Sequence, residues 1–93
     1  MKLLAVCGMG IGTSIILKTN AEKALRNLGV DGDVEVADIG TARGAAVTAD
    51  VVLTSGELAA ELGEVSAEVV VVDNFVDVDE ITSKLSAAIE ARG

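Results

Sequence analysis

The residues best suited to chemistry are a cysteine and the glycines and hydroxyls that follow it directly. From position 7 the chain reads Cys7, Gly8, Met9, Gly10, Ile11, Gly12, Thr13 and Ser14. Alternating glycines let the backbone turn its N–H groups toward one point, which creates a concave anion-binding loop. A cysteine thiolate is a strong nucleophile. The pattern therefore predicts a phosphate-binding loop in which Cys7 carries a phosphoryl group.

A helix is predicted to begin near Thr13 or Ser14, at the end of this loop. The first amides of a helix have no partner within it, and the helix dipole adds positive partial charge there. Both features stabilise an anion, and a helix amino terminus favours a thiolate over a thiol. The two hydroxyls act either as helix caps or as phosphate donors. The loop is thus predicted to hold a dianion without a cationic side chain.

Familiar phosphate and redox motifs are excluded by inspection. A Walker A loop ends in Gly-Lys-Ser/Thr, whereas Gly12-Thr13-Ser14 has no lysine. The dinucleotide motif Gly-x-Gly-x-x-Gly stays incomplete because position 13 is Thr. A glutaredoxin-like site would need Cys-x-x-Cys, and residue 10 is Gly.

The low-molecular-weight protein tyrosine phosphatases are the main structural alternative, since they place a cysteine phosphate loop at the same point of a similar fold. Their loop ends in Cys-x5-Arg, with the Arg binding the phosphate bidentately. The corresponding residue here is Thr13. A loop without that guanidinium should hold a phosphoryl group but hydrolyse it poorly, which favours a carrier. A phosphatase-like hydrolase and a phosphate-binding regulatory module remain as alternatives.

Alternating strands and helices are predicted to position the loop. The apolar runs predict strands at 2–7, 34–38, 50–54 and 69–72. Helical periodicity predicts helices at 14–28, 40–48 and 57–62 and a last one that opens at 77.

Local signals support these helices. In the helix at 14–28 the apolar face comprises Leu17, Ala21, Ala24, Leu25 and Leu28, and the polar face comprises Asn20, Lys23 and Asn27. Gly29 and Gly63 are placed to end their helices, Gly29 in a left-handed conformation. Asp77 and Glu80 resemble a capping box, and Glu80 is spaced to pair with Lys84.

The order of elements predicts one α/β unit over residues 1–93. Right-handed crossovers place helices on both faces of a parallel sheet. We expect a four-stranded sheet of order 2-1-3-4 in a flavodoxin-like, phosphatase-like three-layer sandwich. Ligands then bind beyond the carboxyl ends of the strands, where 7–13, 38–41, 54–56 and 73–75 would meet.

Composition narrows the class of partner. The net charge is −8, and no basic stripe exists that would neutralise nucleic acid or anionic lipid. From Glu57 to Glu80 there are acids and no cation, which is typical of a solvated face and also compatible with a basic partner. One cysteine and no histidine exclude an internal disulfide and the usual zinc sites, so no metal or cofactor is expected.

The amino terminus predicts neither a leader nor a membrane anchor. Only six residues precede Cys7, too few for the leader of a lipoprotein, which needs about 15 or more. No apolar run reaches the roughly 18 residues of a membrane span. We therefore expect a cytoplasmic protein, without direct membrane insertion.

The whole chain resembles the enzyme IIB components of the bacterial phosphoenolpyruvate-dependent sugar phosphotransferase system (PTS). The stretch 4–14, Leu-Ala-Val-Cys-Gly-Met-Gly-Ile-Gly-Thr-Ser, carries the resemblance. It is most similar to the ascorbate-type IIB subunits, in which Cys-Gly-x-Gly-x-Gly-Ser-Ser follows the first strand. Thr13 replaces the first Ser of that pattern and keeps its hydroxyl. Ile16-Leu17-Lys18 resembles the Ile-Leu-Lys that opens the family's helix.

The resemblance implies a phosphotransferase subunit peripheral to a membrane transporter. A phosphohistidine of the IIA protein would donate to Cys7, and the phosphocysteine would pass the group to a sugar bound by membrane-embedded IIC. The lactose/cellobiose, mannitol and galactitol types use related loops, so the sugar branch follows less strongly. Met9 and Ile11 would either form an apolar collar for docking or pack under the loop. Arg43 would either reach the phosphate or be solvated.

Overall fold

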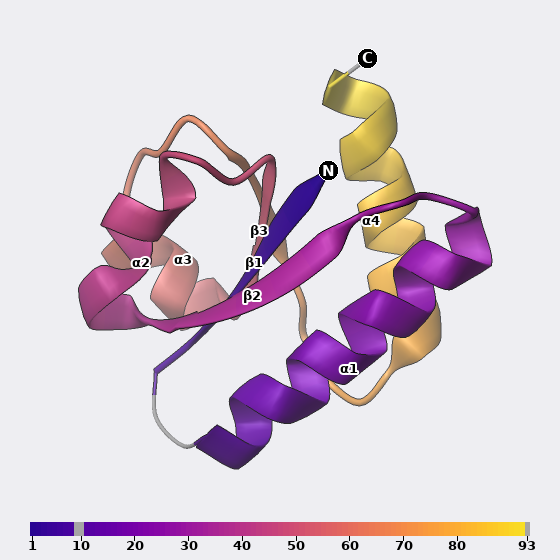
Figure 1. The fold of residues 1–93 in the computed structure, drawn as a ribbon. Helices are drawn as coiled ribbons and strands as arrows, with labels where there is room; N and C mark the ends of the chain where they lie inside the picture. Colours follow the sequence, from indigo (N-terminus) through magenta and orange to yellow (C-terminus); the bar gives the residue numbers. More distant parts are fainter. Residues whose placement is uncertain (9–10, 93) are drawn as a thin grey trace.

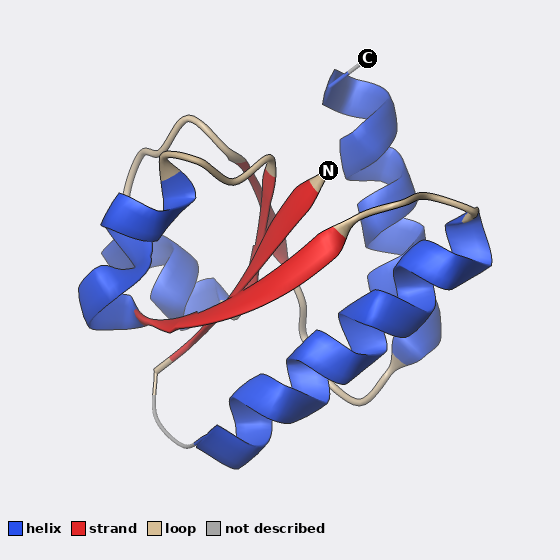
Figure 2. Cartoon of the chain, viewed as in Figure 1, coloured by secondary structure: helices blue, strands red, loops and turns tan. Residues whose placement is uncertain are grey.

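The fold alternates strands and helices from end to end (Figure 1; Figure 2). The computed structural model describes residues 1–8 and 11–92, the side chains of 11–14 and 92 excepted. In chain order the elements are β1 (Lys2–Cys7), α1 (Ile11–Leu28), β2 (Asp33–Asp38), α2 (Ile39–Ala46), β3 (Val51–Thr54), α3 (Gly56–Leu62), β4 (Glu68–Val71) and α4 (Val78–Arg92). The predicted strands and the last three predicted helices are all present, with ends displaced by at most two residues.

The four strands form a parallel sheet of order β2-β1-β3-β4, which confirms the predicted topology. β1 lies in its interior, with Cys7 beside Asp38 of β2 and Ala5 beside Leu53 of β3. Because all strands run in one direction, their carboxyl ends share one edge of the sheet. The segment that follows Cys7 leaves the sheet at that edge.

Helices cover both faces of the sheet and make the predicted three layers. α1 and α4 pack together on one face, and α2 and α3 cover the other (Figure 2). Alternate β1 side chains supply the two cores, since successive residues of a strand point to opposite faces. Leu3, Ala5 and Cys7 face α1 and α4, whereas Leu4 and Val6 face α2 and α3. The cysteine side therefore belongs to the α1–α4 layer.

α1 begins at Ile11, about one turn before the predicted start at Ser14. Glycine and threonine have weak helix propensity, so the sequence predicts that the helix starts after them. The strong amphipathic repeat nevertheless imposes an earlier start of the helix. Gly12 and Thr13 therefore open the helix and are not loop residues. α1 is the longest helix, with 18 residues. Within the described part of the chain, every helix is too short or too polar to cross a bilayer.

The buried face of α1 is wider than predicted. Leu17, Ala21, Ala24 and Leu25 are buried, as expected. Asn20, predicted on the polar face, is only 8% exposed, and that prediction was wrong. α4 packs beside α1 and extends the covered arc, and the carbonyl of Phe75 gives the Asn20 amide a hydrogen-bond partner at 2.7 Å. Burial of this polar side chain is possible because of that bond.

The predicted helix ends at glycine are confirmed. Gly29 follows α1 with φ of 69°, and the Val30 amide donates to the Leu25 carbonyl at 3.0 Å. Gly63 follows α3 with φ of 70°. Positive φ is strained for residues with a Cβ, so glycine suits both positions.

Candidate functional site

Cys7 is the last residue of β1 and lies where the chain leaves the sheet. Its side chain is 4% exposed, and its thiol is not in a disulfide. It belongs to the core cluster that α1 and α4 cover, together with aliphatic side chains such as Leu17 and Leu53. The fold thus holds the sulfur at the carboxyl edge of the sheet, in a mostly apolar setting.

The predicted loop is only partly within the described residues. Gly8 follows Cys7 and is exposed, whereas Met9 and Gly10 lie outside the described residues. Ile11, Gly12, Thr13 and Ser14 form the opening of α1, and their side chains are likewise outside the description. Their predicted roles in binding a phosphoryl group, and the docking roles of Met9 and Ile11, therefore stay predictions.

Gly8 passes close to α3. A Cβ at this position would lie 3.3 Å from Cδ2 of Leu58, tighter than an ordinary carbon contact. Leu58 is held in turn at the start of α3, where its amide donates to the Ser55 hydroxyl oxygen at 3.3 Å. A side chain at position 8 would require Leu58 to move, so glycine lets the chain turn directly over α3.

The two strands that flank β1 contribute different polar groups. On the β2 side, Asp38 is the register partner of Cys7, and its carboxylate accepts from the Thr41 amide at 3.0 Å as the N-cap of α2. On the β3 side, the Thr54 hydroxyl donates to the Val6 carbonyl at 3.2 Å. Thr54 is fully buried. The predicted topology placed 54–56 at this edge, but no sequence motif indicated a particular role for Thr54, the polar residue that follows the apolar run Val51–Leu53.

The segment between β4 and α4 also lies at this edge, and side chains organise its backbone. The Glu80 carboxylate accepts from the amides of Asp73 at 2.8 Å and Asn74 at 3.0 Å. The Asn74 side chain accepts from the Val76 amide at 3.1 Å, and Asn20 donates to the Phe75 carbonyl. The segment is therefore held to both α4 and α1.

The predicted capping box at the start of α4 is only half formed. The Asp77 carboxylate accepts from the Glu80 amide at 3.1 Å, as predicted. The Glu80 carboxylate does not return to the Asp77 amide, which instead donates to the Asn74 carbonyl at 3.0 Å. The Glu80 carboxylate accepts instead from the amides of Asp73 and Asn74, which lie earlier in the chain. The same glutamate thus organises the preceding turn rather than the helix end.

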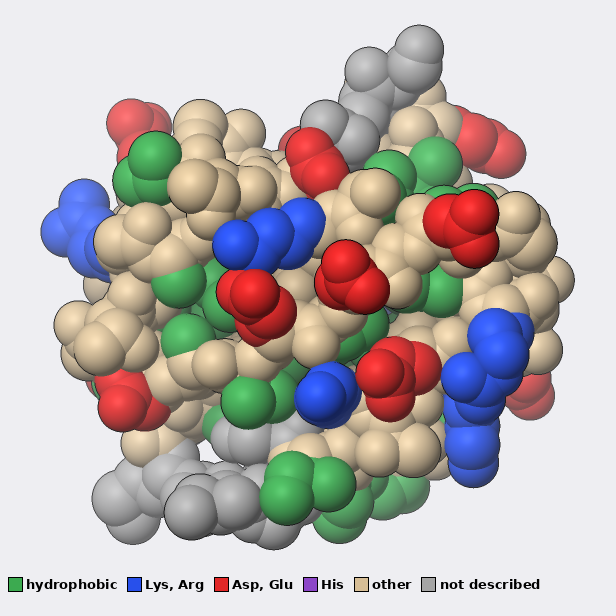
Figure 3. Space-filling view, in the orientation of Figure 1, with side chains coloured by type: hydrophobic (Ala, Val, Ile, Leu, Met, Phe, Trp, Pro, Cys, Tyr) green, Lys and Arg blue, Asp and Glu red, His purple; other side chains and the backbone are tan. Residues whose placement is uncertain are grey.

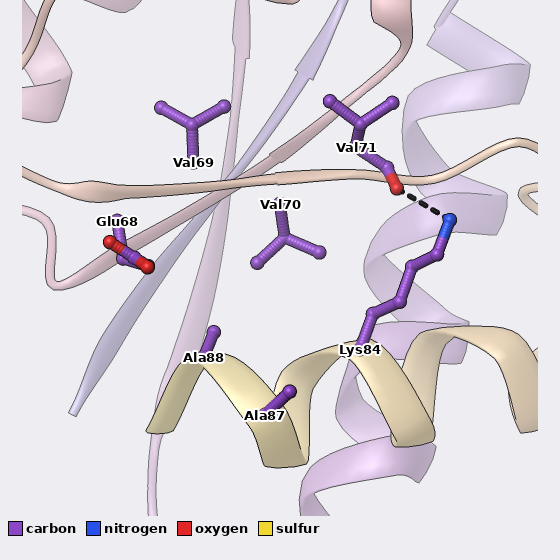
Figure 4. Close-up of a pocket in the computed structure, with 7 residues that line it drawn as sticks. All are labelled: Glu68, Val69, Val70, Val71, Lys84, Ala87 and Ala88. Atoms are coloured by element: carbon purple, nitrogen blue, oxygen red, sulfur yellow. Dashed lines mark hydrogen bonds between the residues drawn. The ribbon is translucent and has the colours of Figure 1, made fainter. Parts of the chain in front are cut away.

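Lys84 completes this polar cluster and confirms the predicted pair with Glu80. Its Nζ donates to the Glu80 carboxylate at 2.6 Å. It also donates to the Val71 carbonyl at 2.8 Å, the bond drawn in Figure 4. The hydrogen bond from Lys84, followed by that from the Asp73 amide, lowers the pKa of Glu80 from its ordinary value of 4.5. The bond to Glu80 raises the pKa of Lys84 above 10.5. Both groups are therefore charged at neutral pH.

An open groove of about 280 Å³ lies between β4 and α4, lined by Glu68–Val71 with Lys84, Ala87 and Ala88 (Figure 4). β3 separates this groove from β1 and hence from Cys7. Its walls are mainly valine and alanine side chains. The groove is therefore no part of the cysteine site.

Arg43 lies beside the carboxyl end of α3. Its guanidinium is 4.0 Å from the position that a Cβ on Gly63 would occupy, at the carboxyl end of α3. The side chain belongs to the last turn of α2 and is exposed. Arg43 was predicted either to reach the phosphate or to be solvated, and its exposed position corresponds to the solvated arginine.

The surface carries mixed charge with few large apolar side chains. Acidic and basic side chains alternate over the face formed by α1 and its neighbours (Figure 3). Near the carboxyl edge, Ile15 and Ile16 of α1 are exposed, and Val76 after β4 is 64% exposed. Among the described residues, no group of three metal-ligating side chains comes together. Ile15, Ile16 and Val76 thus leave exposed apolar side chains on two segments that start from the carboxyl edge of the sheet.

Comparisons with known proteins agree on one family. A family model described as the lactose/cellobiose-specific IIB subunit of the PTS system matches residues 2–87. The chain is 34% identical over 87 residues to an ascorbate-specific PTS system EIIB component of Mycoplasma pneumoniae, covering 92% of both chains. It is 29% identical over 92 residues to the component of the same description from Shigella boydii, covering 98% of this chain and 91% of the relative.

A solved structure has the same fold. The chain superposes on the lactose-specific IIB component domain of the PTS from Streptococcus pneumoniae with a TM-score of 0.61. The match covers 99% of this chain and 93% of the other, at 16% sequence identity. At that identity the likeness concerns the fold alone.

Proposed function

The chain belongs to the family of lactose/cellobiose-specific IIB subunits of the PTS, and on that premise we propose that Cys7 carries a phosphoryl group from a IIA protein to a sugar. The observation that supports this most is the place of Cys7, at the end of the interior strand and directly before the glycine-rich turn into α1. The chain contains no histidine, so the phosphohistidine of such a relay must belong to a partner.

The proposed chemistry has two balanced steps. In the first, the Cys7 thiolate attacks the phosphorus of a phosphohistidine on IIA whose second ring nitrogen carries a proton. An S–P bond forms, and the P–N bond breaks as neutral imidazole leaves. In the second, a sugar hydroxyl held by the transporter IIC attacks the same phosphorus and gives its proton to a base of IIC or to water, and the S–P bond breaks to return the thiolate. Phosphoryl transfer depends mainly on positioning and on stabilisation of charge, which backbone amides supply.

The helix caps support α1 as the element that holds the phosphoryl group. Asp38, Ser55 and Asp77 directly precede α2, α3 and α4, and each side chain accepts from an amide of the first turn. Those amides are already occupied. We propose that the cradle consists of the amides from Gly8 to Ser14 and the hydroxyls of Thr13 and Ser14, with Met9, Gly10, Ile11 and Gly12 contributing backbone.

A carrier is favoured over a hydrolase by the residue at position 13. Threonine stands there in place of the arginine of the cysteine phosphatases. Without a bidentate guanidinium the cradle stabilises a bound phosphoryl group but gives little help to attack by water. The phosphocysteine is therefore expected to persist until a partner accepts the group.

We propose ascorbate, or a closely similar compound, as the acceptor. The two relatives described above are ascorbate-specific components, and they cover more than nine-tenths of this chain. IIA would dock as donor and IIC as acceptor over the same cysteine edge, where Ile15, Ile16 and Val76 are exposed. Such a chain would work as one phosphocarrier domain in the cytoplasm, at the surface of the membrane transporter.

Reconstituted transfer tests this function. The protein is mixed with phosphoenolpyruvate, the general PTS proteins, an ascorbate-type IIA and membrane vesicles that contain the matching IIC. Formation of phosphorylated ascorbate, in amounts that depend on this chain and are abolished by Cys7→Ala, supports the proposal. Transfer to lactose or cellobiose instead of ascorbate refutes the acceptor. Release of free phosphate from a small aryl phosphate, without transfer to either sugar, indicates the hydrolase.

A further inference from the structure

Thr54 lies at the point where β1 and β3 separate. The register between these strands ends at Ala5 and Leu53, whereas β1 continues beside β2 as far as Cys7. The Thr54 carbonyl is already used by β4, since it accepts from the Val72 amide at 2.8 Å. Its hydroxyl turns the other way and donates to the Val6 carbonyl at 3.2 Å. That bond extends the attachment of β1 to β3 by one residue beyond their ladder.

The carbonyl that Thr54 contacts belongs to the peptide unit of Val6 and Cys7. A peptide unit is planar, so a bond that holds its carbonyl also orients the N–H and Cα of the next residue. Cys7 is that residue. Thr54 and Val6 are both fully buried, so water does not replace the hydroxyl. We propose that Thr54 is a positioning residue, which orients the nucleophile Cys7 through the Val6–Cys7 peptide; this inference rests on the proposed function.

The surroundings leave the β3 side of Cys7 dependent on this bond. On the β2 side the ladder holds Cys7 at Asp38. The next residue, Gly8, has no side chain, and a Cβ there would lie 3.3 Å from Cδ2 of Leu58. Rotation of the Val6–Cys7 peptide would therefore swing the sulfur relative to the loop amides. In-line transfer is sensitive to such a displacement, because a shift of about 1 Å lowers rates by about a hundredfold.

Two pairs of variants separate the hydroxyl from the volume of the side chain. Thr54→Val keeps the shape of threonine and removes the donor. Thr54→Ser and Thr54→Ala both lose the methyl group, and they differ from each other only in the hydroxyl. The matched control is Thr82→Val on α4, which removes a buried hydroxyl that has no hydrogen-bond partner. Urea unfolding of each variant ensures that rates are compared per folded molecule.

Single-turnover transfer from phosphorylated IIA to Cys7 then tests the inference. At saturating donor, Thr54→Val and Thr54→Ala are expected to slow the transfer about ten- to a hundredfold. Thr54→Ser and Thr82→Val should stay close to wild type, and the donor concentration at half-maximal rate should stay constant in all four. Equal rates for Thr54→Ser and Thr54→Ala, or a change confined to the half-saturating donor concentration, would refute the positioning role of Thr54. Either result would leave the proposed function of Cys7 standing.

The two levels of the proposal fail in different ways. If wild-type protein accepts no phosphoryl group from any IIA, the proposed function fails and the role of Thr54 fails with it. If Thr54→Val does not fold, the comparison of serine with alanine at the same position still decides the role of the hydroxyl.

Discussion

Replacement of Asn20 by alanine measures how firmly the segment after β4 is held to α1. The side-chain amide donates to the Phe75 carbonyl at 2.7 Å across 55 positions of sequence, and Asn20 is only 8% exposed. Without the donor, a partly buried carbonyl is left unpaired, which costs about 1–3 kcal/mol. Alanine returns about 0.5 kcal/mol through its higher helix propensity. The expected net loss of unfolding free energy is therefore about 0.5–2.5 kcal/mol.

Asn27 provides the matched control on the same helix. It is exposed, so Asn27→Ala is expected to change the free energy of unfolding by less than about 0.5 kcal/mol. Asn20→Leu is a second variant, because it fills the space of the asparagine and still removes the donor. Its loss of stability should be comparable to that of Asn20→Ala.

Urea unfolding followed by circular dichroism gives the three free energies, and thermal unfolding gives a second reading. A loss of 1 kcal/mol corresponds to about 4–8 °C in Tm for a domain of this size. Equal stability of Asn20→Ala and Asn27→Ala would refute the reasoning. It would mean that the bond to Phe75 does not hold this segment against α1 in solution.

Three further changes test other parts of the fold. Gly29→Ala should lower the free energy of unfolding by about 1 kcal/mol in urea titrations, because φ is 69° there and no atom lies within 4 Å to add a clash; an unchanged midpoint would contradict the left-handed helix end. Thr82→Val should be neutral or stabilising by the same assay, since the hydroxyl it removes is buried without a partner; clear destabilisation would reveal a bond that the structure lacks. The pKa of Glu80 is lowered in the fold by its bond to Lys84, so its contribution to stability is present above pH 4.5 and is lost as the pH falls through the lowered value. The difference in urea midpoint between wild type and Glu80→Gln should therefore shrink as the pH falls below 4.5, and a difference that is constant with pH would contradict the role of the charge.

The architecture was predictable because single residues and short runs carry strong local signals. Four β-branched residues in succession predict β4, and Gly29 predicts the end of α1. The alternation of strands and helices then leaves few topologies, and the order of the strands follows the common flavodoxin-like arrangement. Even α2, whose small residues predict a helix only weakly, forms because Asp38 caps its first turn.

The polar contacts across the chain were not predictable from local patterns. Helical periodicity predicts that Asn20 lies on the surface. It is buried because α4 packs beside α1 and the carbonyl of Phe75 accepts its hydrogen bond. Glu80 follows the pattern of a capping box, yet it binds the amides of Asp73 and Asn74 because the turn after β4 brings them closer. Thr54 carries no motif at all, since its role depends on where β1 and β3 separate. Such contacts depend on residues that are distant in sequence, and periodicity does not report them.

The prediction that Cys7 and its loop carry a phosphoryl group rests on chemistry that is local in the sequence. The thiol, the glycines and the hydroxyls are consecutive in sequence, and the strand–helix turn that they occupy is the place where this fold binds anions. What the pattern leaves open is which sugar and which partners the chain serves, since those depend on surfaces of other proteins.

The most direct test of the phosphocarrier is the intact mass of the protein after incubation with phosphoenolpyruvate, the general PTS proteins and a IIA subunit. The account predicts the mass of one phosphoryl group on the wild-type chain, none on Cys7→Ala, and loss of the group when IIC and ascorbate are added. A phosphoryl group that persists in Cys7→Ala, or its absence from reduced, folded wild-type protein with every IIA, would contradict it.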